Sequence, residues 1–262
     1  MTKAAAVCGV PWRLEGDGCA VLPLPGDESI AFLARSQVRA LLPALGLIVE
    51  DVHDLAVMVS ELATNVFQHA MSRDGFAGAE LWVYQRSGER GHDELVVKAF
   101  DTLRQWPRPA APAALRANGA AVVEAREHGR GLEIIEILAN GRWGHHPSRS
   151  RLSSPAVRGK ATWFALPVTR TVRRRHTRPA DGTDAMRDLE ALLVQRGVDR
   201  ILRSDELGVT MLSVRGDLTV WCESATFRWC ARSGETGKLP VGDITEVCEQ
   251  VVRLHEALDE LA

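Results

Sequence analysis

The chain has 262 residues, of which 45% are hydrophobic and 25% are charged. This size and composition suit one sizeable hydrophobic core and a smaller second one. The formal net charge of −2 gives no overall field that would attract nucleic acid or an anionic membrane. No apolar run reaches the ~20 residues of a membrane-spanning helix, and the first residues lack the basic-then-apolar pattern of a secretory signal. We therefore expect a cytoplasmic protein that contacts neither membranes nor nucleic acid directly.

The cysteines and histidines point to no disulfide framework or zinc site. The five cysteines are odd in number and widely spaced, and none forms a Cys-x-x-Cys pair. Free thiols fit a reducing compartment. His145 and His146 are adjacent, but no further ligands stand at the spacing of a zinc site.

In chain order, the first predicted elements are a short edge strand over residues 19 to 24 and an amphipathic helix over residues 27 to 45, which Gly46 ends. A second helix then contains the run from Val59 to Ala70. Its apolar residues follow the spacing of a core-facing helix. They are Val52, Leu55, Val59, Leu62 and Val66.

A polar stripe lies beside this apolar stripe. Glu61, Asn65 and His69 stand four residues apart, and each four-residue step rotates the position by only about 40° on a helix. The Glu61 carboxylate can accept a proton, and the Asn65 amide oxygen can ligate a hard cation such as Mg²⁺. These groups suit phosphate chemistry. The alternative interpretation is an ordinary solvated helix face.

Two strands are predicted next, over residues 80 to 84 and 94 to 100, and the second ends at Asp101. Farther along, the run His128-Gly129-Arg130-Gly131-Leu132 leads into an apolar helix. Glycines let the backbone approach a ligand closely, and the free N–H groups of a helix start favour phosphate oxygens. The alternative is an ordinary loop that enters a packed helix.

An Asn140-Gly141 turn and a closing strand over residues 159 to 164 complete this unit. The order of strand, helix, helix, two strands, helix and two strands predicts a two-layer α/β sandwich with its helices on one face of the sheet.

With its motifs in this order, the segment of residues 25 to 168 resembles the GHKL superfamily of ATP-binding domains. Within it, the segment is most similar to the histidine-kinase-like ATPases related to anti-sigma-factor serine kinases of Gram-positive bacteria. The resemblance implies a Bergerat-type fold that binds ATP and Mg²⁺. Glu61 and Asn65 match the N box, which implies a general base at Glu61 and a Mg²⁺ ligand at Asn65.

The other matched positions concern adenine and the phosphates. Asp101 matches the aspartate that contacts the adenine amino group, and Thr162 matches a threonine that helps to hold adenine. The positions implied near the phosphates are His69, Gly129, Arg130, Gly131 and Leu132. For His69 a local hydrogen bond, and for Arg130 exposure to solvent, are equally open.

The chain departs from the family pattern after Asp101. Thr102 and Leu103 follow it, where the family has Asp-x-Gly-x-Gly. The missing glycine normally lets the backbone approach the nucleotide, so the departure bears on adenine affinity. The stretch over residues 104 to 128, which corresponds to the family's lid, carries three prolines and many alanines.

Residues 1 to 168 are thus predicted to form an ATP-binding domain, followed by a basic linker over residues 169 to 184. A phosphate-binding arm is the alternative interpretation of the linker. Residues 185 to 262 predict a small α+β domain. Its elements are a helix over 185 to 198, strands over 210 to 214, 218 to 222 and 226 to 230, and a final helix over 244 to 261.

Three aromatic residues of the predicted strands, Trp221, Phe227 and Trp229, are spaced so that they could line one sheet face. A face packed under a helix is the preferred interpretation, because aromatic strand residues usually pack. A docking surface for a partner is the alternative.

Two function classes stay open. In the first, the protein is a serine/threonine kinase that phosphorylates an antagonist protein and controls a sigma factor by partner switching. In the second, it is a non-catalytic, nucleotide-responsive binding or adaptor module. Glu61 favours the first class, whereas the missing glycine after Asp101 and the additional domain favour the second. Homodimerisation is compatible with either.

Overall fold

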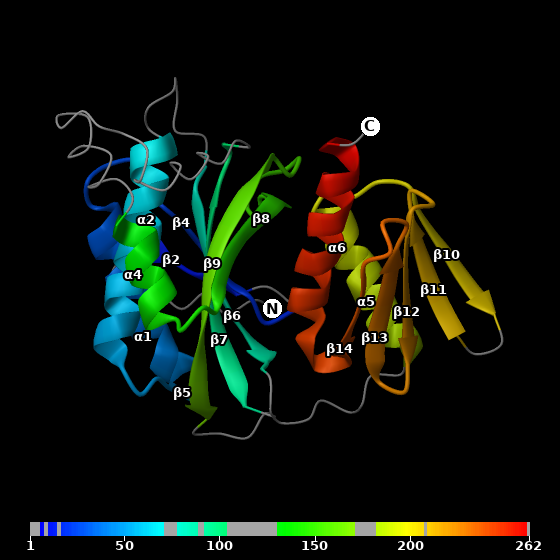
Figure 1. Cartoon of the computed structure of the whole chain (residues 1–262), viewed down its shortest axis with the longest axis horizontal. Coiled ribbons are helices and arrows are strands. Elements are labelled where there is room, and N and C mark those ends of the chain that lie inside the picture. Colours follow the sequence, from blue (N-terminus) through cyan, green and yellow to red (C-terminus); the bar gives the residue numbers. More distant parts are fainter. Residues whose placement is uncertain are drawn as a thin grey trace, which may run out of the picture.

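The structure, a computed structural model, describes residues 6–7, 10–14, 17–70, 78–88, 92–103, 130–170, 182–206 and 209–260. Its elements form four successive layers (Figure 1): helices, a first β-sheet, further helices and a second β-sheet. The strand pairings in these sheets are antiparallel. The fold is therefore of mixed α+β content. Among the described helices, none is both long enough and apolar enough to cross a bilayer.

The first sheet has seven strands in the order β3-β4-β6-β7-β9-β5, and β8 also pairs with β9. Its long strands β7 and β9 are in register so that Asp101 faces Lys160 and Ala99 faces Thr162. The strands are β3 (Arg13–Leu14), β4 (Ala20–Pro23), β5 (Leu47–Ile48), β6 (Glu80–Ser87), β7 (Asp93–Asp101), β8 (Trp143–Arg149) and β9 (Arg158–Arg170). Two short strands, β1 (Ala6–Val7) and β2 (Val10–Pro11), pair separately.

Helices cover one face of this sheet (Figure 1): α1 (Ile30–Ala44), α2 (Val52–Ala70) and α4 (Arg130–Leu138). Helix α2 begins after Asp51, whose carboxylate accepts hydrogen bonds from the backbone N–H groups of His53 and Asp54 at 2.9 and 3.0 Å. This cap satisfies donors that a helix start otherwise leaves unpaired. The predicted apolar stripe is buried at Leu55, Val59, Leu62 and Val66, whereas Val52 is 40% exposed.

The C-terminal unit has its own five-stranded sheet and hydrophobic core. Both predicted helices and all three predicted strands are present. Strands β10 and β14, at the two edges of the sheet, had not been predicted. The elements are α5 (Gly182–Gln195), β10 (Ile201–Glu206), β11 (Val209–Val214), β12 (Leu218–Glu223), β13 (Thr226–Ala231), β14 (Thr236–Pro240), a 3₁₀ turn (Val241–Asp243) and α6 (Ile244–Glu260).

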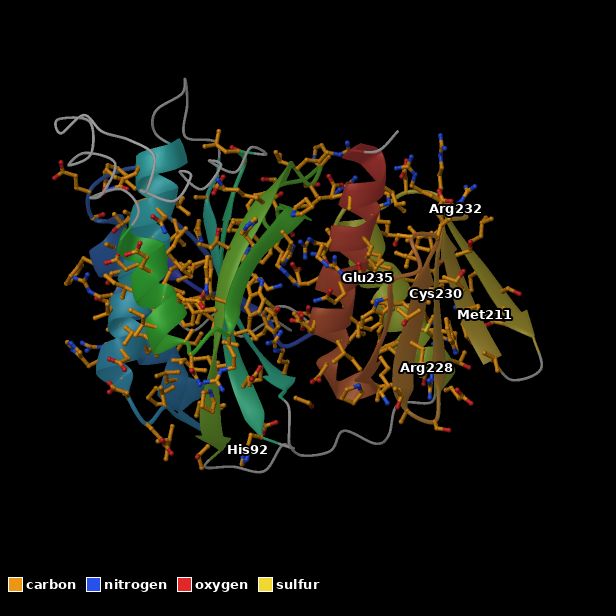
Figure 2. The ribbon with its side chains drawn as sticks, in the orientation of Figure 1. His92, Met211, Arg228, Cys230, Arg232 and Glu235 are labelled. Carbon is orange, nitrogen blue, oxygen red and sulfur yellow. The ribbon has the colours of Figure 1, made fainter. Side chains whose placement is uncertain are left out.

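The aromatic residues of this sheet do not share one face. Phe227 and Trp229 are buried in the core, as preferred. Trp221 pairs with Met211 on one side and Arg228 on the other, and directly paired residues lie on the same face of a sheet. Met211 and Arg228 are labelled in Figure 2. Trp221 therefore lies on the outer face, because its position is one residue out of phase with Phe227 and Trp229.

Helix α6 packs on the face of the first sheet that α1, α2 and α4 leave open (Figure 1), and side chains fill the space between them (Figure 2). Glu249 of α6 is fully buried there. One of its oxygens accepts hydrogen bonds from Arg196 and, at 3.2 Å, from Arg151. Lys98 Nζ lies 3.7 Å from the other oxygen.

The cations determine the charge state of this buried carboxylate. Burial by itself would raise the pKa of Glu249, but Arg196, Lys98 and Arg151 outweigh it and hold that pKa well below its usual range. The two guanidinium groups also lie over the Trp82 ring, Arg151 at 5.4 Å and Arg196 at 4.9 Å from the ring centre. Nothing in the sequence pattern indicated this contact between the units, and the domain boundaries at residues 168 and 185 stay a prediction.

Candidate functional site

The start of α4 lies directly against the polar stripe of α2. A Cβ atom added at Gly131 would be 2.6 Å from Oε2 of Glu61 and 3.6 Å from Oδ1 of Asn65. The first distance is shorter than real Cβ contacts allow. A glycine at position 131 therefore leaves room for the Glu61 carboxylate, with which a larger residue would clash. The structure thus brings together three predicted site residues from two separate motifs.

Asn65 carries a buried polar atom without a partner among the residues that the structure describes. This atom is the side-chain nitrogen Nδ2. Buried polar groups almost always have a partner, so such a group calls for a specific explanation. A half-turn of the amide exchanges its nitrogen and oxygen, so this position can present either a donor or a cation ligand to a bound group.

Asp101, at the end of β7, already has partners within the chain. Its Oδ1 accepts a hydrogen bond from the backbone N–H of Leu103 at 2.9 Å, and its Oδ2 lies 3.7 Å from Lys160 Nζ. Burial raises the pKa of Asp101 to about 6, although the Lys160 ammonium opposes the rise. The backbone here is tightly packed, because a Cβ at Gly159 would lie 2.0 Å from the Asp101 carbonyl oxygen.

Thr162 lies two residues beyond Lys160 on β9. It is 7% exposed and pairs with Ala99 on one side and His145 on the other. Burial and the nearby Lys160 ammonium both lower the pKa of His145. The strand that the sequence singled out for Thr162 thus also places a cation beside Asp101.

Lys160 was missed by sequence reasoning. Its signal was a single lysine at the head of an apolar strand, in the run Gly159-Lys160-Ala161-Thr162. Lys160 is 6% exposed. Because a buried ammonium group requires a partner, the lysine indicates a nearby carboxylate, which Asp101 supplies.

The remaining predicted residues are placed less completely. Leu132 packs against the main hydrophobic core. His69 and Arg130 belong to α2 and α4 by their backbone, but their side chains lie outside what the structure describes. Gly129 and residues 104 to 128 also lie outside the described residues. The described contacts join Glu61, Asn65 and Gly131 in one group and Asp101, Gly159 and Lys160 in another.

Both groups belong to the same end of the first unit, which consists of the seven-stranded sheet with α1, α2 and α4. In Figure 1, β7 runs toward the end of the sheet at which α2 also finishes. Among the described residues, no three His, Cys, Asp or Glu side chains are grouped as a metal site. Magnesium in nucleotide sites takes one or two protein oxygens and completes its shell with phosphate and water, so the magnesium expectation rests on Asn65.

Compared with models of known protein families and with curated proteins, the chain shows no significant match.

Proposed function

We propose that the first unit is a Bergerat-type domain that binds Mg·ATP, and that the protein is a serine/threonine kinase acting on an antagonist protein in a sigma-factor partner switch. The observation that carries this proposal is the contact of Gly131 with Glu61 and Asn65. It joins a carboxylate, an unsatisfied amide and the start of a helix, and each of these suits one part of a nucleotide phosphate site.

The start of α4 supplies the electrostatic part of the proposed site. Free backbone N–H groups and the positive end of a helix dipole favour anionic oxygens. Because Gly131 has no side chain, these groups are not shielded on the side that faces Glu61 and Asn65. The Asn65 amide would hold the cation, and bound Mg·ATP would supply the phosphoryl group.

Glu61 is the proposed general base. Its carboxylate lies beside the helix start, where it would take the proton from the serine or threonine hydroxyl of the protein substrate. Phosphoryl transfer depends mainly on positioning and charge neutralisation, so the rigid packing of α2 against α4 would contribute by holding Glu61 and Asn65 in place.

Asp101 and Thr162 are the proposed adenine contacts, and the state of Asp101 supports the second function class. Both of its carboxylate oxygens face donors of the chain itself, Leu103 N–H and Lys160 Nζ. Adenine would have to share or displace those partners. Weakened adenine binding would favour a nucleotide-responsive adaptor without efficient turnover.

Labelled ATP distinguishes the two classes. We expect the full-length protein with Mg²⁺ to transfer label to serine or threonine of a candidate antagonist protein. Glu61→Gln should lower the transfer rate by about 10²–10⁴-fold and leave Mg·ATP binding intact. Glu133→Gln, at an exposed position of α4, is the matched control and should transfer label at the normal rate.

Each other outcome has a defined meaning. Binding of Mg·ATP without transfer to any candidate would support the adaptor function. Normal transfer by the Glu61→Gln variant would remove Glu61 from the role of general base.

A further inference from the structure

A cavity of about 670 Å³ lies between the two units. Arg86, His92 and Arg142 contribute to its wall from the first unit, and Trp229 and Gly237 contribute from the second sheet. It lies near the start of β7, so it is at the opposite end of that strand from Asp101; Figure 2 labels His92 at this end. Cavities of this volume at domain interfaces are typical of small-molecule sites.

The first unit contributes a guanidinium group, that of Arg142, which no carboxylate of the described residues neutralises. Arg86 is paired with Glu94 at 2.9 Å and with Glu246 at 3.4 Å. Within the described part of the chain, Arg142 has no such carboxylate, and its Nε is buried without an acceptor. A buried charged donor without an acceptor is costly unless something else supplies one.

The acidic residues of the wall are not available to Arg142. Glu246 accepts hydrogen bonds from Tyr84 Oη at 2.6 Å and from Gln250 Nε2 at 2.7 Å, besides its contact with Arg86. Burial would raise the pKa of Glu246, but Lys98 and Arg86 outweigh burial and lower it to about 2. This carboxylate therefore stays ionised and engaged with its own partners.

The second unit contributes an aromatic ring to the wall. Trp229 is 6% exposed, and its buried Nε1 has no hydrogen-bond acceptor in the described parts of the chain. The ring packs directly on the backbone of Gly237, where a Cβ would lie 2.0 Å from a ring carbon. Gly237 therefore leaves room for the ring, which lines the cavity.

We propose that this cavity binds a small organic anion, whose carboxylate or phosphate oxygens pair with the Arg142 guanidinium beside the Trp229 ring. Guanidinium groups pair well with both kinds of oxyanion, and the surplus in the wall is of donors rather than acceptors. The anion bridges the two units, so its binding stabilises their contact. This site is independent of the proposed nucleotide site.

The indole N–H signal of Trp229 provides a local test. The full-length protein, labelled with ¹⁵N at its tryptophans, is titrated with glycerol 3-phosphate, with citrate and with glycerol, and a Trp229→Phe variant assigns the signal. We expect at least one of the two anions to move this signal saturably at concentrations up to about 10 mM, and glycerol to leave it in place. The response to each anion distinguishes a phosphate ligand from a carboxylate ligand.

Variants of the guanidinium complete the test. Arg142→Met should weaken anion binding by about tenfold or more. Arg142→Lys, which keeps the charge but lacks the Nε donor, should weaken it less. Arg39→Met, at an exposed position on α1, should have no effect. A Trp229 signal that neither anion moves, or equal affinities for wild type and both Arg142 variants, would overturn the proposal.

Discussion

Two glycines near the candidate site are required for different physical reasons. At Gly131 the nearest obstacle to a side chain is the end of the Glu61 side chain, which can rotate away. At Gly159 it is the backbone carbonyl of Asp101, which is fixed in the β7–β9 pairing. The glycine at 131 therefore determines where the Glu61 carboxylate lies, whereas the glycine at 159 is needed for the two strands to pair.

Alanine substitutions should separate these two roles. We expect Gly131→Ala to lower the free energy of unfolding by less than about 1 kcal/mol while it displaces the Glu61 carboxylate and reduces phosphoryl transfer. Gly159→Ala should cost about 1–3 kcal/mol or more, because backbone must move. Urea unfolding of both variants measures the difference, and equal losses of stability would contradict it.

Asp101 should make stability depend on pH. Its pKa is about 6 in the folded protein against an ordinary value of 3.8, so the folded state holds the proton more tightly than the unfolded state. Between these two pKa values the folded state binds more protons, and this group's contribution to stability falls as the pH rises.

Asp101→Asn removes this titration. The free energy of unfolding of the variant, minus that of wild type, should therefore be higher at pH 7 than at about pH 4, by up to about 3 kcal/mol. Urea unfolding of both proteins at the two pH values gives the comparison. The same difference between variant and wild type at both values would rule out a raised pKa at Asp101.

Among the elements, those with strong periodicity were predictable and those without it were not. The apolar stripe of α2 buries one face of the helix, whereas the apolar runs of β7 and β9 are buried on both faces of the sheet. Both patterns were visible in the sequence. Strand β5 has only two residues, and β14 reads Thr-Gly-Lys-Leu-Pro. Their position comes from pairing with a neighbouring strand, which a local pattern does not encode.

The start of α2 offers a test of the element that carries Glu61 and Asn65. Asp51→Ala removes the acceptor for the N–H groups of His53 and Asp54 and should cost about 0.5–2 kcal/mol of stability. Asp51→Asn keeps an acceptor oxygen and should restore most of it. Thermal unfolding measures both variants, and equal losses for the two would mean that the cap does not stabilise the helix.

In the whole molecule, the contact between the two units was the least predictable feature. Glu249, Arg151, Arg196 and Lys98 are scattered through the sequence, and charged residues in such positions normally indicate solvent-exposed surface. Only the folded arrangement shows that they pair with one another in a buried interface.

The candidate site was more accessible to sequence reasoning, because its residues lie in two compact motifs. Lys160 is the exception, because its role follows only from its position opposite Asp101 in the β7–β9 pairing.

This interface should make the two units unfold together. Glu249→Ala removes the carboxylate that Arg196, Lys98 and Arg151 share, while Arg151 keeps its contact with Asp17. This loss should cost about 3–5 kcal/mol. Glu235→Ala, which removes a surface partner of Arg253, is the matched control and should cost about 1 kcal/mol or less; Figure 2 labels Glu235.

Calorimetry should show one cooperative transition for the wild type and for Glu235→Ala, and an earlier or divided transition for Glu249→Ala. Two separate transitions in the wild type would show that the units are energetically independent.

The central claim is that α2 and the start of α4 together form a Mg·ATP site. Titration calorimetry of the full-length protein with ATP, with and without Mg²⁺, tests it most directly. We expect Mg²⁺-dependent binding that Asn65→Ala weakens by about tenfold or more, and that Gln68→Ala, an exposed amide on the same helix, leaves unchanged. An Asn65→Ala variant with wild-type affinity, or a folded wild-type protein that binds no Mg·ATP at millimolar concentration, would contradict the claim.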